Sequence, residues 1–388
     1  MKIGIACFGT SGGSGSVAVG LGQALASLGH SVDFIAPHRP PRLACLSERV
    51  QFQEVRGFDY PLFDPADHAF ALAAKLADVG QRKRLDLVHA HYALPHAVSA
   101  CLARELLRGR FSLPVITTLH GTDVTILGRD PSTYALAKYA MTQSDGLTTV
   151  SNFLAGEIAD RFQVPGVRVI PNFVDTDNFQ PGASVAGLRE RLAPSGEKLI
   201  MHISNFRPIK QAGHCVQIFS RIRRKIRCRL VMVGDGPEVH RTQELARELG
   251  VERDVVFVGE QAGVVDYLRV ASLLLLPSKT ESFGLAALEA MSCEVPVVAS
   301  LVGGLPEVVD DGISGRLLPC GDLDGMAVAA AEILANEKMG ASFGRAGRAT
   351  AINRFSADRV VPLYLEYYRQ VIDQFKPAMG APEARFVR

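Results

Sequence analysis

The sequence predicts an α/β protein made of two doubly wound parallel-sheet domains that face an inter-domain cleft. Three observations lead to this prediction: the length of 388 residues, short apolar runs that alternate with helix-period segments, and a restart of that alternation after residues 172–194. The length suits two cores of roughly 150–200 residues each. Strand–helix alternation is typical of parallel sheets covered by helices on both faces, with ligands at the carboxyl ends of the strands.

The first half predicts six strands, at residues 3–8, 32–36, 85–89, 115–119, 146–150 and 167–170. Apolar residues recur at i, i+3 and i+4 in 17–28, 72–81 and 96–107, which predicts helices there. We assign residues 1–173 to an N-terminal domain.

The second half predicts strands at residues 198–203, 229–233, 255–258, 272–277 and 296–299. Helices are expected near 212–224, 238–249 and 283–291. We assign 174–355 to a C-terminal domain and 356–388 to a C-terminal helix (358–374) and frayed tail (377–388). This last segment is expected to pack back on the N-terminal domain.

Charge and cysteine content exclude several classes of protein. The 42 basic and 40 acidic residues nearly balance, which gives no electrostatic case for nucleic-acid binding. The basic run 221–229 carries isoleucines at helical spacing, which favours a solvated helix face. Seven scattered cysteines without a CxxC pair favour the reducing cytoplasm over a disulfide framework. No apolar run is long enough to span a membrane, so no membrane insertion is expected.

A glycine-rich loop, Gly12-Gly-Ser-Gly-Ser16, follows the first strand and opens the first helix. Glycines allow close backbone approach, and a helix N-terminus offers N–H groups to an anion, so Gly13 and Ser16 are candidate binding residues. The GxGxxA pattern lacks the acidic residue expected at the end of the second strand, which argues against NAD. A tight turn without a ligand remains the alternative.

Two glutamates, Glu281 and Glu289, flank the start of a predicted helix after an apolar strand. Carboxylates suit sugar hydroxyls because each accepts two hydrogen bonds, and the helix end between them suits phosphate. Arg207 and Lys210 follow the first strand of the second domain, where together they could neutralise a diphosphate. The alternatives are an exposed, charged helix start and a solvated cation pair.

Histidines 89, 91, 96 and 120 gather around two predicted strands of the first half. Zinc binding is one interpretation, but the carboxylate signature of such sites is missing. A hydrogen-bonded polar cluster lining a pocket is favoured.

These segments resemble glycosyltransferase family 4, whose members are retaining enzymes with the GT-B fold of two Rossmann-like domains. The resemblance rests on Glu281 and Glu289, Asn205–Lys210, Gly234-Asp-Gly-Pro237 and Gly303-Gly-Leu-Pro-Glu307, and extends from residue 4 to about 315. The N-terminal half is most similar to members that act on L-malate in the first step of bacillithiol biosynthesis, through Gly12–Ser16, His89–His96, Thr117–Asp123 and Leu127–Pro131. Two departures are Glu294, where the family usually has glycine, and Gln211, where a second basic residue is common.

The resemblance implies a UDP-N-acetylglucosamine donor and specific roles for these residues. Arg207 and Lys210 would stabilise departing UDP, Glu281 and His120 would contact the transferred sugar, and Glu289 the ribose. Further donor-binding residues implied by the resemblance are Gly13, Asn205, Gly259, Gln261, Phe283, Gly284 and Leu285. Acceptor-binding candidates are Ser16, Tyr92, Thr118, Asp123 and Asn152, with Arg207 shared.

The implied reaction is attack of the 2-hydroxyl of L-malate on the anomeric carbon with retention, without a metal or other cofactor. The leaving phosphate itself would take the acceptor's proton, so electrostatic stabilisation carries most of the catalysis. The expected partners are a UDP-sugar and a small dicarboxylate, and a homodimer is left open. Three alternatives remain: another small acceptor such as an inositol phosphate, a UDP-N-acetylglucosamine 2-epimerase, and a non-catalytic nucleotide-sugar-binding module.

Overall fold

The computed structural model describes residues 1–10, 12–43, 45–57, 68–261 and 263–375, which form two compact units. The first unit comprises Met1–Thr148, Arg161–Arg168 and the described part of Val361–Arg388. The second comprises Thr149–Asp160 and Val169–Val360. The tail expected at 377–388 lies outside the described residues.

The first unit is built on a sheet of seven strands among the described residues, in the order β3-β2-β1-β4-β5-β6-β7. The pairs β1–β2, β2–β3, β1–β4 and β4–β5 are parallel. The strands are β1 Lys2–Ala6, β2 Ser31–Ala36, β3 Val50–Glu54, β4 Leu87–His91, β5 Val115–Leu119, β6 Gly146–Thr149 and β7 Arg168–Val169. β1, β2, β4 and β5 are almost entirely buried, as expected of strands covered on both faces.

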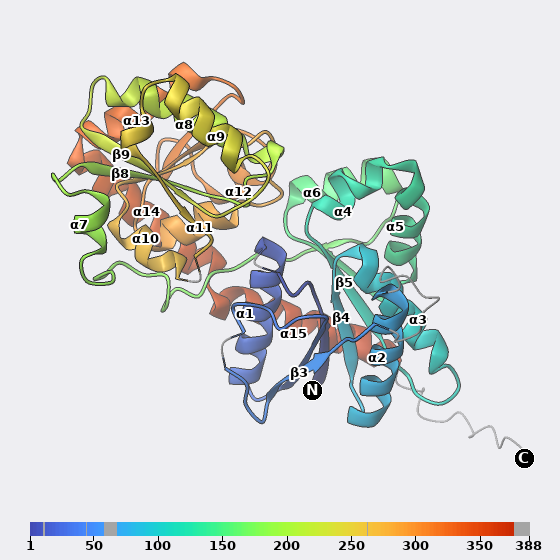
Figure 1. Ribbon diagram of the computed structural model, residues 1–388. Helices are drawn as coiled ribbons and strands as arrows, with labels where there is room; N and C mark the ends of the chain where they lie inside the picture. Colours follow the sequence, from blue (N-terminus) through green and yellow to red (C-terminus); the bar gives the residue numbers. More distant parts are fainter. Residues whose placement is uncertain (11, 44, 58–67, 262, 376–388) are drawn as a thin grey trace, which may run out of the picture. The chain divides into compact units, whose positions relative to one another are not determined.

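Helices cover both faces of this sheet, with α1 and α15 on one face and α2 and α3 on the other (Figure 1). The helices are α1 Gly13–Ser27, α2 His68–Lys83, α3 Val98–Leu106, α4 Thr122–Thr125, α5 Pro131–Gln143 and α15 Ala357–Gln374, and the next helix, α6 Asn152–Phe162, lies mostly in the second unit. α5 begins at Pro131 because Asp130 caps it, accepting a hydrogen bond from Ser132 N–H. α15 buries Tyr364 and Tyr368 completely, which ties this helix to the first unit.

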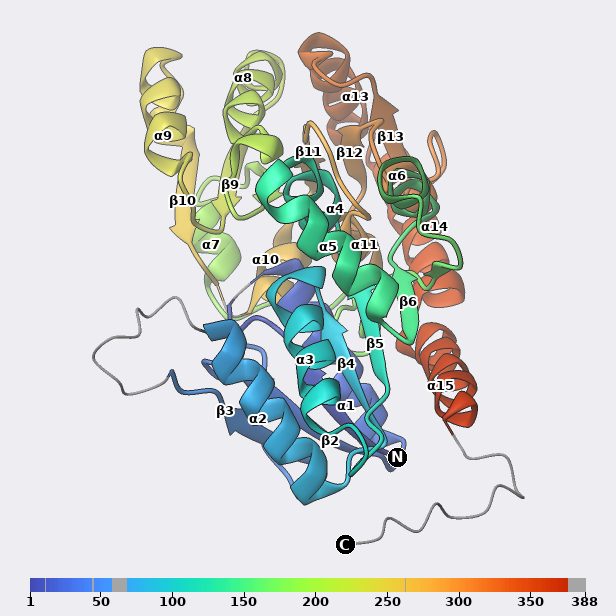
Figure 2. The same ribbon diagram turned by 90° about the vertical axis from the view of Figure 1, so that its right-hand side faces the viewer.

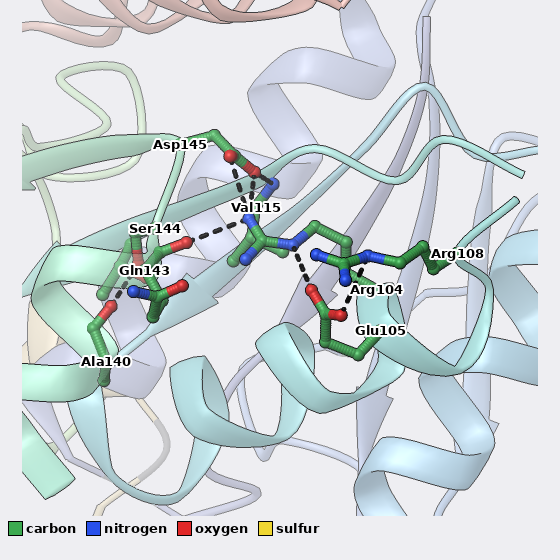
Figure 3. A network of polar contacts seen from close by, with 9 residues as sticks. Arg104, Glu105, Arg108, Val115, Ala140, Gln143, Ser144 and Asp145 are labelled. Atoms are coloured by element: carbon green, nitrogen blue, oxygen red, sulfur yellow. Dashed lines mark hydrogen bonds and ion pairs between the residues drawn. The ribbon is translucent and has the colours of Figure 1, made fainter.

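An ion-pair network fixes the amino end of β5 in the first unit (Figure 3). Nη1 of Arg104, on α3, donates to both carboxylate oxygens of Asp145 at 2.8 Å and to the carbonyl of Gln143 at 2.9 Å. Asp145 also accepts from Val115 N–H at 2.8 Å. The network therefore joins α3, the end of α5 and β5 at the edge opposite the carboxyl ends of the strands.

The second unit is built on a six-stranded sheet in the order β10-β9-β8-β11-β12-β13 (Figure 2). All five strand pairs are parallel. Within the described residues, the strands are β8 Lys198–Ile203, β9 Cys228–Val233, β10 Val255–Gly259, β11 Leu273–Leu276, β12 Val297–Ser300 and β13 Gly315–Leu318. The predicted pair of parallel α/β sheets is confirmed.

In this unit α8, α9 and α13 cover one face of the sheet, and α10, α11 and α14 cover the other (Figure 1). The helices are α7 Leu188–Leu192, α8 Ala212–Arg223, α9 Val239–Glu248, α10 Val264–Val270, α11 Leu285–Ser292, α12 Leu305–Val308, α13 Leu323–Ala335 and α14 Glu337–Phe355. A core of buried residues from β8, β9, β11, α8 and α13 joins the first face to the sheet.

One predicted strand of the first unit is displaced, and several elements of both units were not predicted. The strand expected at 85–89 is β4, Leu87–His91, because Leu85 and Asp86 still form the turn that leaves α2. The helix expected from residue 96 is α3, Val98–Leu106, and the residues directly before it form a π-helical turn, Ala93–Ala97, that runs into α3. The elements that were not predicted are the strands β3 and β13 and the helices α4, α5, α6, α7, α10, α12, α13 and α14.

Candidate functional site

The loop after β8 carries the predicted cations of the second unit. Phe206 is fully buried and has a left-handed backbone (φ 44°), which turns the chain before Arg207. A β-carbon on Gly234 would lie 1.8 Å from the Ser204 carbonyl oxygen, and one on Gly236 2.0 Å from that of Asn205. The two glycines are therefore required for the turn after β9 to pack against this loop.

Lys210 and Glu281 are brought together as an ion pair. Lys210 Nζ lies 2.6 Å from Glu281 Oε1, and Ser278 Oγ donates to the same oxygen at 2.9 Å. The side chains of Lys210 and Glu281 are 21% and 11% exposed, so the pair is accessible yet largely shielded from water. The backbone supports it, because Lys279 N–H donates to the Ile209 carbonyl at 2.8 Å.

The loop of Glu281 is closely packed against the segment that follows β12. Gly304 N–H donates to the Glu281 carbonyl at 2.9 Å, and a β-carbon on Gly303 would lie 1.9 Å from that carbonyl oxygen. Gly284 has a left-handed backbone (φ 103°) and precedes the first residue of α11, Leu285. The close backbone contacts at residues 303 and 304 and the left-handed backbone at residue 284 explain why these three positions are glycines.

The remaining donor candidates lie around this loop or on neighbouring strand ends. Glu289 is buried within α11, 5% exposed, and Phe283 packs edge-on against Phe355. Gly259, at the end of β10, accepts from Gly234 N–H at 2.8 Å, while Gln261 Nε2 donates to the Val258 carbonyl. Oδ1 of Asn205 is buried and has no hydrogen-bond partner among the described residues.

In the first unit, the glycine loop forms the start of α1. Gly13 is exposed and Ser16 is partly exposed, with Ser16 N–H donating to the Gly12 carbonyl at 3.0 Å. A β-carbon on Gly15 would lie 2.7 Å from the Thr10 carbonyl oxygen. Gly15 is therefore needed for the turn itself, whereas Gly13 and Ser16 lie at accessible positions.

A stack of rings runs beside the ends of β4 and β5. The Tyr92 ring lies over that of His120 (centroids 5.5 Å apart), and the His120 ring over that of His91 (5.1 Å). His91 Nδ1 and His120 Nε2 are 2.9 Å apart and share a hydrogen bond. Tyr92 has a left-handed backbone (φ 93°), a conformation that few residues other than glycine adopt.

Burial keeps these imidazoles neutral near pH 7. Burial, together with the charge of a neighbouring histidine, lowers the pKa of His89 and of His120 to about 3. The pKa of His91 is lowered well below its usual value by the same causes. Burial also raises the pKa of Asp123 to about 6, against the backbone N–H groups that stabilise its charge. The cluster therefore offers neutral hydrogen-bonding groups.

Two acceptor candidates lie beneath the surface. Thr118 is 0% exposed, and its Oγ1 is 2.6 Å from both His89 Nε2 and Thr148 Oγ1. Asp123 is also 0% exposed and accepts from the N–H groups of Gly121, His120 and Ala93. Both side chains thus hold the ends of β4 and β5 in place.

Asn152 belongs to the second unit, apart from the other acceptor candidates. Its backbone N–H and its side-chain Nδ2 both donate to Glu307 Oε2 at 2.9 Å, and Phe153 N–H donates to Glu307 Oε1 at 2.8 Å. Glu307 therefore caps the N-terminus of α6. Glu307 was expected only as the last residue of the motif 303–307, and no local pattern indicates this long-range cap.

Both departures from the family pattern have left-handed backbones. Glu294 has φ 60° and Gln211 has φ 52°. Glycine adopts this conformation at no steric cost, so the usual glycine at position 294 has a direct physical reason.

Ser278, the second partner of Glu281, was missed because a single serine after a strand carries no distinctive signal.

The basic run is partly neutralised within the second unit. Arg221 pairs with Asp324, Arg223 pairs with Asp254, and Arg229 donates to two backbone carbonyls. The predicted helix face is only partly right, because α8 ends at Arg223 and β9 begins at Cys228, so residues 224–227 lie in the turn between them. In the part of the chain that the structure describes, no group of three or more His, Cys, Asp or Glu side chains is arranged to hold a metal ion. No described helix is long and apolar enough to cross a membrane.

Comparisons with known proteins match both halves of the chain. Residues 11–178 match the model of Glycosyltransferase Family 4, and residues 188–350 that of Glycosyl transferases group 1. The chain is 38% identical over 373 residues to N-acetyl-alpha-D-glucosaminyl L-malate synthase of Bacillus anthracis, covering 96% of this chain and 97% of that one. It is 30% identical over 313 residues to D-inositol 3-phosphate glycosyltransferase of Saccharomonospora viridis, covering 75% and 71%.

Among solved structures, Anabaena Alr3699/HepE in complex with UDP and glucose superposes with a TM-score of 0.77. The two chains are 21% identical over 94% of this chain and 98% of that one. This likeness concerns the fold alone. Together with the two parallel sheets, it confirms the predicted GT-B fold.

Proposed function

This chain belongs to glycosyltransferase family 4 and is a sugar-transferring enzyme, and we propose that it moves N-acetylglucosamine from UDP-N-acetylglucosamine to the 2-hydroxyl of L-malate. The observation that carries this proposal is the 38% identity to the Bacillus anthracis malate synthase, which extends over nearly the whole of both chains. The complex of Alr3699/HepE with UDP supports a UDP-sugar donor. The product would enter bacillithiol biosynthesis in the cytoplasm.

In the proposed reaction, the malate 2-hydroxyl oxygen bonds to the anomeric carbon while the bond from that carbon to the UDP oxygen breaks. The hydroxyl proton passes to an oxygen of the leaving phosphate, and the configuration is retained. Negative charge grows on UDP, so fixed positive charge beside it lowers the barrier. Arg207 and Lys210 are assigned this role, and no metal is required.

The Lys210–Glu281 contact gives this assignment a physical basis. The pair holds the ammonium in place without ligand, because Glu281 Oε1 and the lysine are 2.6 Å apart. An arriving diphosphate would share the same cation, and a preorganised charge needs little rearrangement as the transition state forms. Glu281 would then also accept from a sugar hydroxyl, and Glu289 from the ribose.

In the first unit, His120 is proposed as a neutral hydrogen-bond partner of the transferred sugar. With a pKa near 3 it carries no charge at neutral pH. Among the acceptor candidates of the first unit, Tyr92 and Ser16 are more accessible than Thr118 and Asp123, which are fully buried.

A second candidate acceptor is an inositol phosphate, because D-inositol 3-phosphate glycosyltransferases are about 30% identical to this chain. A phosphorylated acceptor calls for additional cations near the glycine loop, and residues 9–20 contain no Lys or Arg. This absence favours the dicarboxylate.

The test is an acceptor screen that follows UDP release from UDP-N-acetylglucosamine with L-malate, D-malate or inositol 3-phosphate. We expect release with L-malate alone and an unchanged rate in EDTA. Release only with inositol phosphate would replace the acceptor, and formation of the manno isomer without acceptor would indicate an epimerase. UDP binding without turnover would indicate a non-catalytic module.

A further inference from the structure

A buried histidine lies beneath the loop that carries the two cations. His202 is the fifth residue of β8, is 0% exposed, and takes no part in the proposed chemistry. Its Nδ1 is 3.0 Å from the Leu275 carbonyl oxygen on β11, and its Nε2 is 2.8 Å from Ser204 Oγ. Cys215 Sγ lies 3.1 Å from the same Nδ1.

These contacts settle which ring nitrogen carries the proton. A carbonyl oxygen only accepts, so Nδ1 must be the N–H that donates to Leu275. Burial lowers the pKa of His202 to about 4, so the ring is neutral at pH 7 and Nε2 is an acceptor. Ser204 O–H therefore donates to Nε2, and Ser204 Oγ in turn accepts from Phe206 N–H at 3.2 Å.

This directed chain of hydrogen bonds ends on Phe206, whose backbone conformation is unfavourable for a residue with a side chain. Phe206 is fully buried with φ 44°, a conformation that persists only when its surroundings hold it. Its N–H is held by Ser204, and its carbonyl accepts from Glu238 N–H at 3.0 Å. Arg207 follows directly, and the Arg207 carbonyl accepts from Lys210 N–H at 2.8 Å.

We propose that His202 is a positioning residue, which acts through Ser204 and Phe206 to present Arg207 and Lys210 to the diphosphate of the donor. The inference rests on the proposed function, since it presumes that these cations bind a diphosphate. His202 itself touches no substrate. It orients a polar chain whose direction is set by the Leu275 carbonyl, on a neighbouring strand of the same sheet.

The test compares binding of UDP and of uridine by titration calorimetry, because only UDP has the phosphates that the cations contact. In the Ser204→Ala variant, UDP binding should weaken about tenfold while uridine binding stays unchanged. Ser204→Thr keeps the hydroxyl and should restore UDP binding. Cys215→Ala is the matched control, since it removes a neighbour of His202 but no link of the chain.

A coupling measurement keeps the proposal falsifiable if one variant is unstable. The His202→Leu variant should weaken UDP binding no more than Ser204→Ala does. The double variant should also bind UDP as well as Ser204→Ala alone, because both residues act through the same chain of hydrogen bonds. Three results would overturn this role of His202: additive losses of UDP affinity in the double variant, equal weakening of UDP and uridine binding, or wild-type UDP affinity in Ser204→Ala. Each would leave the glycosyltransferase assignment intact. Failure of the wild-type protein to bind UDP would overturn the proposed donor as well.

Discussion

The polar clusters at the carboxyl ends of the two sheets differ in charge. In the first unit, burial lowers the pKa of His89 and His120 to about 3 and leaves them neutral. In the second unit, Lys210 and Glu281 lie 2.6 Å apart with side chains 21% and 11% exposed. Burial without a counter-charge favours the neutral form, whereas an opposite charge at contact distance favours ionisation of both partners.

This difference indicates a division of physical roles. Neutral imidazoles and hydroxyls provide directional hydrogen bonds, which suit recognition of sugar hydroxyls and neutral groups. Fixed charge acts on charge that develops during a reaction, so the second cluster is expected to affect rate more strongly. Changes to either cluster therefore test the comparison.

The largest effect is expected for Lys210→Ala. Removal of the ammonium takes away charge stabilisation of UDP and leaves Glu281 without its counter-charge, so kcat should fall by about 100-fold or more. Steady-state UDP release measures this. Lys279→Ala, at an exposed neighbouring lysine, is the control and should retain the wild-type rate. A Lys210→Ala variant within about fivefold of wild type would contradict the charged role.

The second prediction concerns the neutral cluster and pH. Because the folded pKa of His89 is lowered from 6.5 to about 3, its neutral form stabilises the protein fully above pH 6.5, and that contribution declines as the pH falls toward 3. Between pH 7 and pH 5 the loss from His89 should be about 2 kcal/mol. Between these pH values, the His89→Gln variant should therefore lose about 2 kcal/mol less unfolding free energy than the wild type. Urea unfolding at both pH values measures this difference.

Exposed His240 provides the matched control for this pH experiment. Its side chain is 79% exposed, so His240→Gln should leave the pH dependence unchanged. Asp123 acts in the opposite direction, because its raised pKa makes the folded state less stable as the pH rises from 3.8 to about 6. An unchanged pH dependence in His89→Gln would show that His89 is charged or accessible in the folded protein.

The smallest effect is expected at Glu294, a carboxylate of the second unit outside the charged cluster. Its backbone is left-handed (φ 60°) and its side chain is exposed, so Glu294→Gly should stabilise the fold by about 0.5–1 kcal/mol without changing the rate. Urea unfolding measures the gain. Glu332→Gly, within helix α13, should instead destabilise by a similar amount. Loss of stability in Glu294→Gly would show that its side chain makes a stabilising contact.

Much of the fold could be predicted because buried parallel strands are continuous apolar runs. Residues 115–119 and 198–203 were placed at their observed bounds for this reason. β3 was missed because Val50–Glu54 lies at the edge of the sheet and alternates polar residues. α14 was missed because its glycines and polar residues give a weak helical period.

Site residues were predicted by type and by position after a strand, but their contacts were not. Lys210 and Glu281 are 71 residues apart, and no local pattern indicates that they meet. Thr118 was expected to bind the acceptor, yet its hydroxyl is taken by His89 and Thr148. Periodicity reports which face of an element is apolar, and it carries no information about the partner of a polar side chain.

The sequence by itself determined the two parallel sheets, the glycine turns and the residue types available at the strand ends, because each depends on local pattern or backbone freedom. Only the tertiary structure decided that the histidines are neutral, that Lys210 pairs with Glu281, and that Glu307 caps α6. Charge state and pairing depend on burial and on neighbours distant in the chain, which folding alone brings together.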